Sequence, residues 1–167
     1  MSKPSRRIAT LALCILVLDQ FTKWLVLRGI DLGDEIPVIP GFFNLTHRTN
    51  TGAAWSQFSG HNAVLATIAI IAIVVLIRMR HHFSAHRLLG QFAFGLIFGG
   101  IVGNLVDRIL PGRNAVVDFL HFYMARRGGE AFDFPAFNVA DSAICTGVAL
   151  IFIINWKDDR KQLASDA

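Results

Sequence analysis

Residues 137–142 read Phe137-Asn138-Val139-Ala140-Asp141-Ser142, and an apolar segment continues from them to Trp156. A helix over 139–156 is long enough, at about 1.5 Å per residue, to cross most of the hydrocarbon core of a bilayer. Asn138 and Asp141 have the spacing of a capping box, in which the positive end of the helix dipole favours the acid. An acid inside a membrane segment is equally typical of a functional site, and Asp118 upstream is the candidate partner.

The composition predicts a single small membrane domain that spans residues 1–167. Of these residues, 53% are hydrophobic and only 17% are charged, and the mean hydropathy is +0.49. The chain is too apolar for a soluble domain of this size. A pI of about 9.6 could indicate nucleic-acid binding, but the basic residues fall at the edges of hydrophobic runs rather than along one stripe. We therefore expect no nucleic-acid partner.

Hydrophobic runs predict four transmembrane helices, at about 8–28, 62–78, 88–110 and 139–156. The basic residues before the first run resemble the start of a signal peptide, but no small-x-small cleavage site follows them. We therefore expect this run to be the first transmembrane helix. Two β-prone pieces in the next region, 35–39 and 42–46, are joined by Pro40 and Gly41 and predict a small hairpin outside the membrane.

The distribution of Lys and Arg predicts the orientation. Segments 1–7, 78–87 and 157–167 together hold nine of them in 28 residues, whereas 28–61 and 109–137 hold five in 63. The denser side is cytoplasmic by the positive-inside rule. Both termini are then expected in the cytoplasm, with the regions at about 29–61 and 111–138 on the outer face.

Polar residues gather near the outer ends of the predicted helices. Asp19 and Lys23 are four residues apart, the spacing of an ion pair on one helix face. In the third run, glycines that let another helix approach closely are followed by polar residues: Gly95, Gly99 and Gly103, then Asn104, Asp107 and Arg108. All the charged and amide groups lie within about 13 Å of the outer helix ends. This common depth favours one shared polar pocket, while ion pairs that merely hold helices together remain the alternative.

No metal or cofactor is predicted. Cys14 and Cys145 lie inside apolar runs without metal-ligand spacing, so we expect small core residues rather than a disulfide or a zinc site. Three histidines, His81, His82 and His86, fall between the second and third runs. No carboxylate or cysteine accompanies them, which favours a hydrated surface cluster over a metal site.

Five short blocks resemble those of the lipoprotein signal peptidase (signal peptidase II) family. In order, they are Asp19-Gln20-x-Thr22-Lys23, Asn50-Thr51-Gly52-Ala53-Ala54, Gly103-Asn104-x-x-Asp107-Arg108, Val117-Asp118-Phe119 and Phe137-Asn138-x-Ala140-Asp141-Ser142. Each block alone is a weak signal, but the ordered set over residues 19–142 is highly specific. The stretch 121–136 is longer than the spacing usual in the family.

The resemblance implies an all-α membrane protein of the bacterial inner membrane, with four transmembrane helices, a small periplasmic β-cradle and a short interfacial helix. It implies an aspartic endopeptidase that cuts prolipoproteins just before a cysteine carrying diacylglycerol, works among membrane lipids and is inhibited by globomycin. By block, Asp118 and Asp141 would be the catalytic pair. Other block residues would line or brace the site, namely Asn50, Gly52, Asn104, Arg108 and Asn138. Asp19, Lys23 and Asp107 would form a structural polar network.

The residues themselves suit this chemistry. No serine or cysteine has an obvious base partner, and no histidine pair has zinc spacing on a helix. Two carboxyl groups held close in a low-dielectric site cannot both ionise easily, so one can donate a proton while the other takes one from water. A proton- or ion-coupled transporter with Asp19, Asp107 and Asp141 as a relay is an alternative, although the chain shows no internal repeat. A non-catalytic assembly factor built on the glycine repeat is another.

Overall fold

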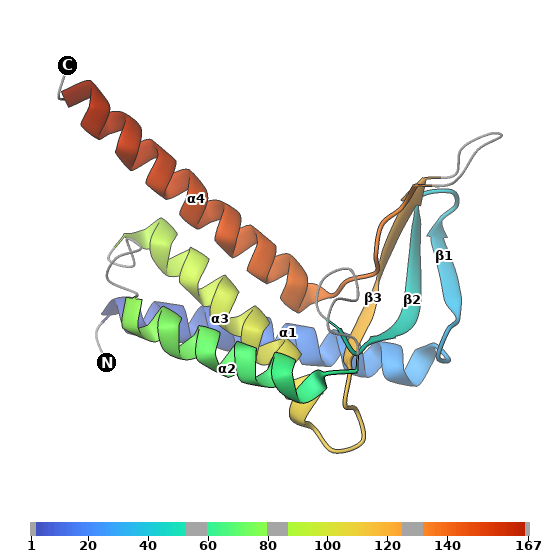
Figure 1. Ribbon diagram of the computed structural model, residues 1–167. Helices are drawn as coiled ribbons and strands as arrows, with labels where there is room; N and C mark the ends of the chain where they lie inside the picture. Colours follow the sequence, from blue (N-terminus) through green and yellow to red (C-terminus); the bar gives the residue numbers. More distant parts are fainter. Residues whose placement is uncertain (1–2, 53–59, 80–86, 125–131, 166–167) are drawn as a thin grey trace.

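The computed structural model describes residues 3–52, 60–79, 87–124 and 132–165. Its elements in chain order are α1 (Lys3–Gly29), β1 (Glu35–Ile39), β2 (Phe43–Asn50), α2 (Asn62–Met79), α3 (Leu88–Ile109), β3 (Val116–Met124), β4 (Phe132–Asp133) and α4 (Val139–Ser165). The helices lie on one side and the sheet on the other, where α1 and α3 end and α2 and α4 begin (Figure 1). The start of α1 and the end of α4 lie far from the sheet.

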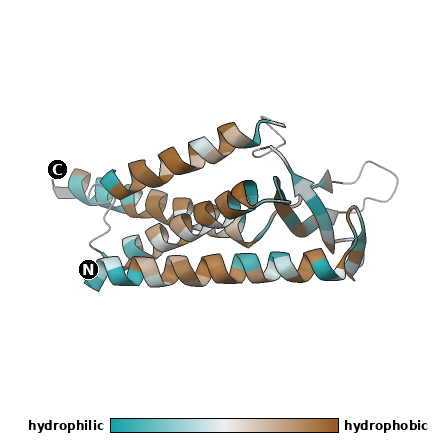
Figure 2. Cartoon of the chain, turned by 90° about the horizontal axis from the view of Figure 1, so that it is seen from below, coloured by the Kyte–Doolittle hydropathy of each residue, from teal (hydrophilic) through white to brown (hydrophobic). Residues whose placement is uncertain are grey.

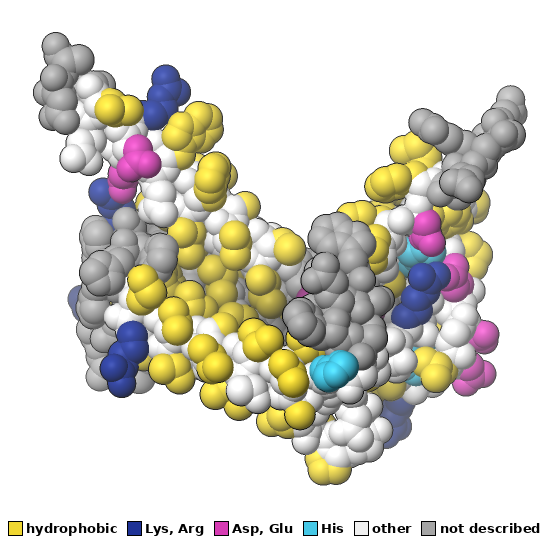
Figure 3. Space-filling model, viewed as in Figure 1, with side chains coloured by type: hydrophobic (Ala, Val, Ile, Leu, Met, Phe, Trp, Pro, Cys, Tyr) yellow, Lys and Arg dark blue, Asp and Glu magenta, His cyan; other side chains and the backbone are white. Residues whose placement is uncertain are grey.

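All four helices are long and apolar enough to cross a membrane. Hydrophobic residues cover their middle parts, and polar residues gather at the sheet and at the opposite helix ends (Figure 2). In α2 only Leu65 is buried, so nearly all of its apolar side chains face outward. Figure 3 shows hydrophobic side chains spread over the helical part of one face. Such a surface is stable against lipid and would aggregate in water.

Helix α3 lies at the centre of the bundle and packs against the other three helices. Its glycines permit the close approach. A Cβ atom at Gly95 would lie 2.8 Å from the Cβ of Leu11, and one at Gly99 would lie 2.7 Å from the carbonyl oxygen of Ala12. The glycine repeat therefore contacts α1, as its spacing predicted for helix packing. Because this face is used inside the molecule, it is not left free for a partner of an assembly factor.

The sheet has the order β1-β2-β3-β4, with every neighbouring pair antiparallel. The predicted hairpin is present, but its second strand continues to Asn50 instead of ending near residue 46. Strands β3 and β4 were not predicted. Val117 and Phe119 of β3 pack against Val26 at the end of α1, and this small core fixes the sheet on the bundle.

Two helices extend beyond the predicted transmembrane spans. Helix α1 begins at Lys3, before the span at about 8–28, and α4 continues to Ser165, beyond the span at about 139–156. Hydropathy marks the part of a helix that suits lipid, whereas the polar residues at either end continue the same helical hydrogen bonding. Cys14 and Cys145 are free, as expected, but both are exposed on the helices and are not core residues.

Two further expectations fall outside the described residues: the histidine cluster at 81–86 and the short interfacial helix. Within the described part of the chain, no group of three or more His, Cys, Asp or Glu side chains is placed to hold a metal ion.

Candidate active site

The two predicted catalytic aspartates come from different elements and line one cavity of about 600 Å³. Asp118 lies in β3, between the core residues Val117 and Phe119, and is only 3% exposed. Because side chains alternate across a strand, Asp118 points to the opposite side from these two neighbours. Asp141 lies in the first turn of α4. The same cavity is lined by four other predicted site residues, Asn50, Gly52, Asn104 and Arg108.

Asn138 links the two carboxyl groups. Its Nδ2 donates to Asp118 Oδ1 at 2.7 Å, and its Oδ1 accepts the backbone N–H of Asp141 at 2.9 Å. In return, Asp141 Oδ2 accepts the backbone N–H of Asn138 at 3.3 Å. This reciprocal pair is the predicted capping box at the start of α4. The capping and the functional interpretations of Asp141 are therefore compatible, since the cap holds the acid at the cavity.

Asn50 and Arg108 brace the other side of the cavity. Asn50 is the register partner of Val116 across β2 and β3, and its Nδ2 donates to Asp118 Oδ2 at 3.1 Å. The Oδ1 of Asn50 accepts the backbone N–H of Gly52 at 2.9 Å. From α3, Arg108 Nη2 donates to the Gly52 carbonyl oxygen at 2.6 Å. The end of β2 is thus tied both to β3 and to α3.

Amide groups supply the hydrogen bonds to both acids. Asn104 Nδ2 donates to Asp141 Oδ1 at 2.7 Å, as the side-chain amides of Asn50 and Asn138 donate to Asp118. Among the described residues, no lysine or arginine forms a salt bridge with either aspartate. An amide donor can stabilise a carboxylate without forcing it to stay ionised, so the protonation of the pair remains free to change.

The pKa of Asp118 is raised to about 7. Burial is the largest cause and the negative charge of Asp141 adds to it, whereas hydrogen bonds from Asn50 and Asn138 and the charge of Lys23 act in the opposite direction. Two acids that share donors in a low-dielectric site titrate as a pair. The pair can therefore hold one proton near neutral pH, the state that general acid–base chemistry needs.

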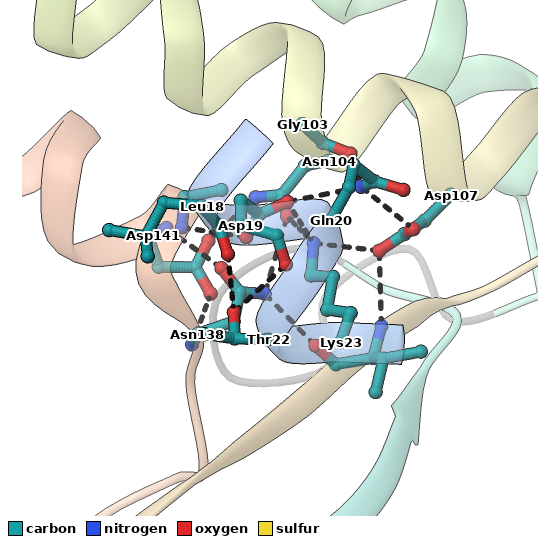
Figure 4. Close-up of polar contacts among 12 residues, drawn as sticks. Leu18, Asp19, Gln20, Thr22, Lys23, Gly103, Asn104, Asp107, Asn138 and Asp141 are labelled. Carbon is teal, nitrogen blue, oxygen red and sulfur yellow. Dashed lines mark hydrogen bonds and ion pairs between the residues drawn. The ribbon is translucent and has the colours of Figure 1, made fainter. Parts of the chain in front are cut away.

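Behind the pair lies a group of four charged residues that we call the charge cluster: Asp19, Lys23, Asp107 and Arg113 (Figure 4 labels the first three). Lys23 Nζ lies 2.9 Å from Asp19 Oδ2 and 2.7 Å from Asp107 Oδ2, and all three side chains are fully buried. Arg113 Nη1 lies 2.5 Å from Asp107 Oδ1. The predicted Asp19–Lys23 pair is confirmed. Asp19 and Asp107 share one cation, which does not suit a relay that passes ions or protons.

Two residues of this region had been assigned no role from the sequence. Gln20 Nε2 donates to Asp19, Asp107 and the carbonyl oxygen of Gly103, at 3.1 to 3.2 Å. Arg113 donates to Asp107 and to the side-chain oxygen of Gln20. Gln20 lies inside the first of the five family blocks, so the sequence did contain a signal that this residue has a role. Arg113 follows a Pro-Gly turn, and only the folded chain shows that this turn returns it to the helix.

The sequence matches the family described as Signal peptidase (SPase) II over residues 11–157. The chain belongs to this family. It is similar to the lipoprotein signal peptidases of Anoxybacillus flavithermus, with 40% identity over 91% of this chain and 86% of that protein, and of Bacillus subtilis, with 41% identity over 91% and 94%. Family membership agrees with the paired acids and sets the transporter alternative aside.

Solved structures agree in fold. Two bacterial membrane enzymes determined by the in meso method superpose on this chain with TM-scores of 0.78 and 0.75, at 37% and 38% identity. The first match covers 91% of this chain and 88% of the other, and the second covers 90% and 93%. This signal peptidase II family member is therefore a multi-pass bacterial membrane protein with four long helices and a small antiparallel sheet.

Proposed function

We propose that Asp118 and Asp141 are the catalytic residues with which this signal peptidase II family member removes signal peptides from prolipoproteins. The observation that carries the proposal is the pair itself: one buried and one partly buried carboxyl group, joined by Asn138 at a cavity and held by amide donors. A pKa of about 7 for Asp118 supports a shared proton at neutral pH.

The surroundings of the two acids suggest their roles. Each acid accepts two hydrogen bonds, but only Asp141 also lies at the positive end of the α4 dipole, which favours its charged form relative to Asp118. Asp141 is then the base that takes a proton from the attacking water, while protonated Asp118 donates to the oxygen of the scissile carbonyl. When the C–N bond breaks, the proton on Asp141 passes to the leaving nitrogen and Asp118 recovers its own proton from the tetrahedral hydroxyl group. No covalent intermediate with the protein is needed.

The cavity provides both polar and apolar contacts for a substrate. Arg108 Nε is buried and has no hydrogen-bond partner among the described residues, so it offers a donor to a peptide carbonyl. Other lining residues of the cavity are apolar, among them Phe134, Phe137 and Ile144. We propose that Asn50, Asn104 and Arg108 hold the substrate backbone, while the apolar walls accept the diacylglyceryl-modified cysteine just after the scissile bond. Globomycin is expected to compete for the same cavity.

Orientation and depth complete the proposal. The Lys and Arg distribution supports cytoplasmic termini and a periplasmic active site. Asp141 lies in the first turn of α4, about 3 Å below its outer end, so the scissile bond must reach the interface while the signal peptide stays in the bilayer. Each buried methylene of the diacylglyceryl group contributes about 0.8 kcal/mol to membrane attachment. The lipid would thus hold the bond at the depth of the two acids.

The test compares one prolipoprotein with and without diacylglycerol on its cysteine. Each form is incubated with the purified protein, and loss of the signal peptide is followed as a gel shift. We expect cleavage of the lipidated form only, blocked by globomycin. Equal rates for the two forms would show that depth is set in another way, and cleavage of neither form would contradict the proposed activity.

A further inference from the structure

We infer that Lys23 is a positioning residue for the catalytic pair and acts through Asn104. The inference rests on the proposed function, because it assigns Lys23 a part in the same reaction. Lys23 Nζ is fully buried and faces three acceptors: Asp107 Oδ2 at 2.7 Å, Asp19 Oδ2 at 2.9 Å and Asn104 Oδ1 at 3.1 Å. An ammonium group has three donors and no acceptor, so each of its hydrogens has a partner here.

The third of these contacts fixes the orientation of the Asn104 amide. Since an ammonium can only donate, the Asn104 atom that faces Lys23 must be the oxygen. The NH₂ group then points the other way and donates to Asp141 Oδ1 at 2.7 Å. Asn138 Nδ2 also donates to the Asn104 oxygen, at 3.2 Å. Without the ammonium, this amide would lose one of the contacts that fix its orientation, and a turned amide would present its oxygen to a carboxylate. Figure 4 labels Asn104 together with Lys23 and Asp141.

A second path runs from Lys23 to the backbone that carries Asp141. Asp19 Oδ2 binds Lys23, and its other oxygen accepts the backbone N–H of Ala140 at 2.9 Å. Ala140 lies in the first turn of α4, next to Asp141. The close approach needs Gly103, where a Cβ atom would lie 2.6 Å from Asp19 Oδ2. Lys23 therefore holds both the amide that donates to Asp141 and the helical turn from which Asp141 projects.

The charges around Lys23 determine how it must be tested. It faces Asp19 from its own helix and Asp107 from α3, and Asp107 also binds Arg113, so the charge cluster is neutral. Among the described residues that line the cavity, the charged groups are Arg108 from α3, Asp118 from β3 and Asp141 from α4. Removing Lys23 alone would leave a buried carboxylate unpaired, which destabilises the fold. A loss of activity could then come from misfolding instead of a misplaced catalytic group. A charge-balanced variant avoids this.

The main variant is Lys23→Met combined with Asp19→Asn, which removes one positive and one negative charge, leaves the Asp107–Arg113 pair intact and keeps a side-chain oxygen for the Ala140 N–H. The matched control is Gln20→Met, which removes hydrogen bonds from the same cluster without touching Asn104. In the double variant we expect kcat to fall by about 100-fold with little change in KM, since a catalytic group displaced by about 1 Å can lose that much. Lys23 lowers the pKa of Asp118, so the alkaline limb of the kcat/KM profile should move to higher pH. Gln20→Met should lower the melting temperature and leave kcat and the pH profile near wild type.

Asn104→Ala tests the same path without disturbing the charges, because Lys23 keeps both carboxylates. We expect it to lose most of the kcat that the double variant loses, and the triple variant to lose less than the two losses combined, since residues on one path are not additive. Wild-type kcat in Asn104→Ala would overturn the inference by itself. Additive losses, or losses in Gln20→Met equal to those of the double variant, would also overturn it. Absence of cleavage by the wild-type protein in this assay would instead contradict the proposed function.

Discussion

The charge cluster and the proposed catalytic pair each contain two aspartates at the same end of the bundle, and they differ in their partners. All of these side chains are buried except that of Asp141, which is partly buried. Asp19 and Asp107 bind cations, with oxygen to nitrogen distances of 2.5 to 2.9 Å. Asp118 and Asp141 are bound by amides instead. An ion pair holds a carboxylate in one protonation state, because separating buried charges is costly. Amide donors leave the proton exchangeable, so the partner rather than the aspartate decides whether the site is structural or chemical.

The largest expected effect comes from removing the exchangeable proton. Asp118→Asn and Asp141→Asn keep the shape of the side chain but lose its acid–base chemistry. Each should lower the cleavage rate of a lipidated prolipoprotein by about 10⁴-fold or more. The control is membrane insertion and purification as for the wild type. Normal turnover by either variant would remove that residue from the catalytic pair.

Removing a partner from the charge cluster should act on stability. Asp19→Ala leaves Lys23 with one carboxylate fewer and the Ala140 N–H without its acceptor. We expect a loss of about 3–5 kcal/mol in the free energy of unfolding, typical of a broken buried ion pair. Thermal unfolding in detergent measures it. Asp19→Asn keeps an oxygen for Ala140 and should lose less. A wild-type melting temperature for Asp19→Ala would mean that the cluster does not stabilise the fold.

The pH dependence of stability should report on Asp118. Asp118 has a folded-state pKa of about 7, above its usual 3.8, so the folded protein binds this proton more tightly than the unfolded chain. Its contribution is complete below pH of about 4 and is lost as the pH rises to about 7. Asp118→Asn lacks this loss. Its stability relative to wild type should therefore increase by about 2–3 kcal/mol between about pH 5 and about pH 8.

The same unfolding measurements on Asp31→Asn, which changes an exposed acid before β1, provide the control for Asp118→Asn. If the stability difference between Asp118→Asn and wild type stayed constant over this pH range, the raised pKa of Asp118 would be wrong.

The smallest effect is expected at an exposed ion pair on the sheet. Arg48 Nη2 lies 2.5 Å from Glu35 Oε1, and the two side chains are 43% and 32% exposed, respectively. Hydrogen bonding from Arg48 lowers the pKa of Glu35. Water screens such a pair, so Glu35→Gln should change the free energy of unfolding by less than about 1 kcal/mol and leave cleavage unchanged. A loss of cleavage would show that the sheet does more than carry Asp118.

The sequence alone determined the features that depend on residues close together in the chain. Hydropathy over about 20 residues predicted the four helices, the spacing of four residues predicted the Asp19–Lys23 pair, and the spacing of three predicted the capping box of Asn138 and Asp141. These predictions succeed because a helix converts sequence spacing directly into distance. Helix ends were less accurate, since hydropathy does not report where helical hydrogen bonding stops.

Only the tertiary structure decided which distant residues meet. The family blocks named Asp118 and Asp141 together, but their joint attachment to Asn138, the return of Arg113 to Asp107 and the orientation of Asn104 by Lys23 required the packed molecule. Strands β3 and β4 were missed for the same reason, because a strand is stabilised by partners elsewhere in the chain. Contacts between α1, α3, α4 and the sheet have no fixed sequence spacing, so their geometry follows from how the glycines of α3 and the core of β3 allow the elements to pack.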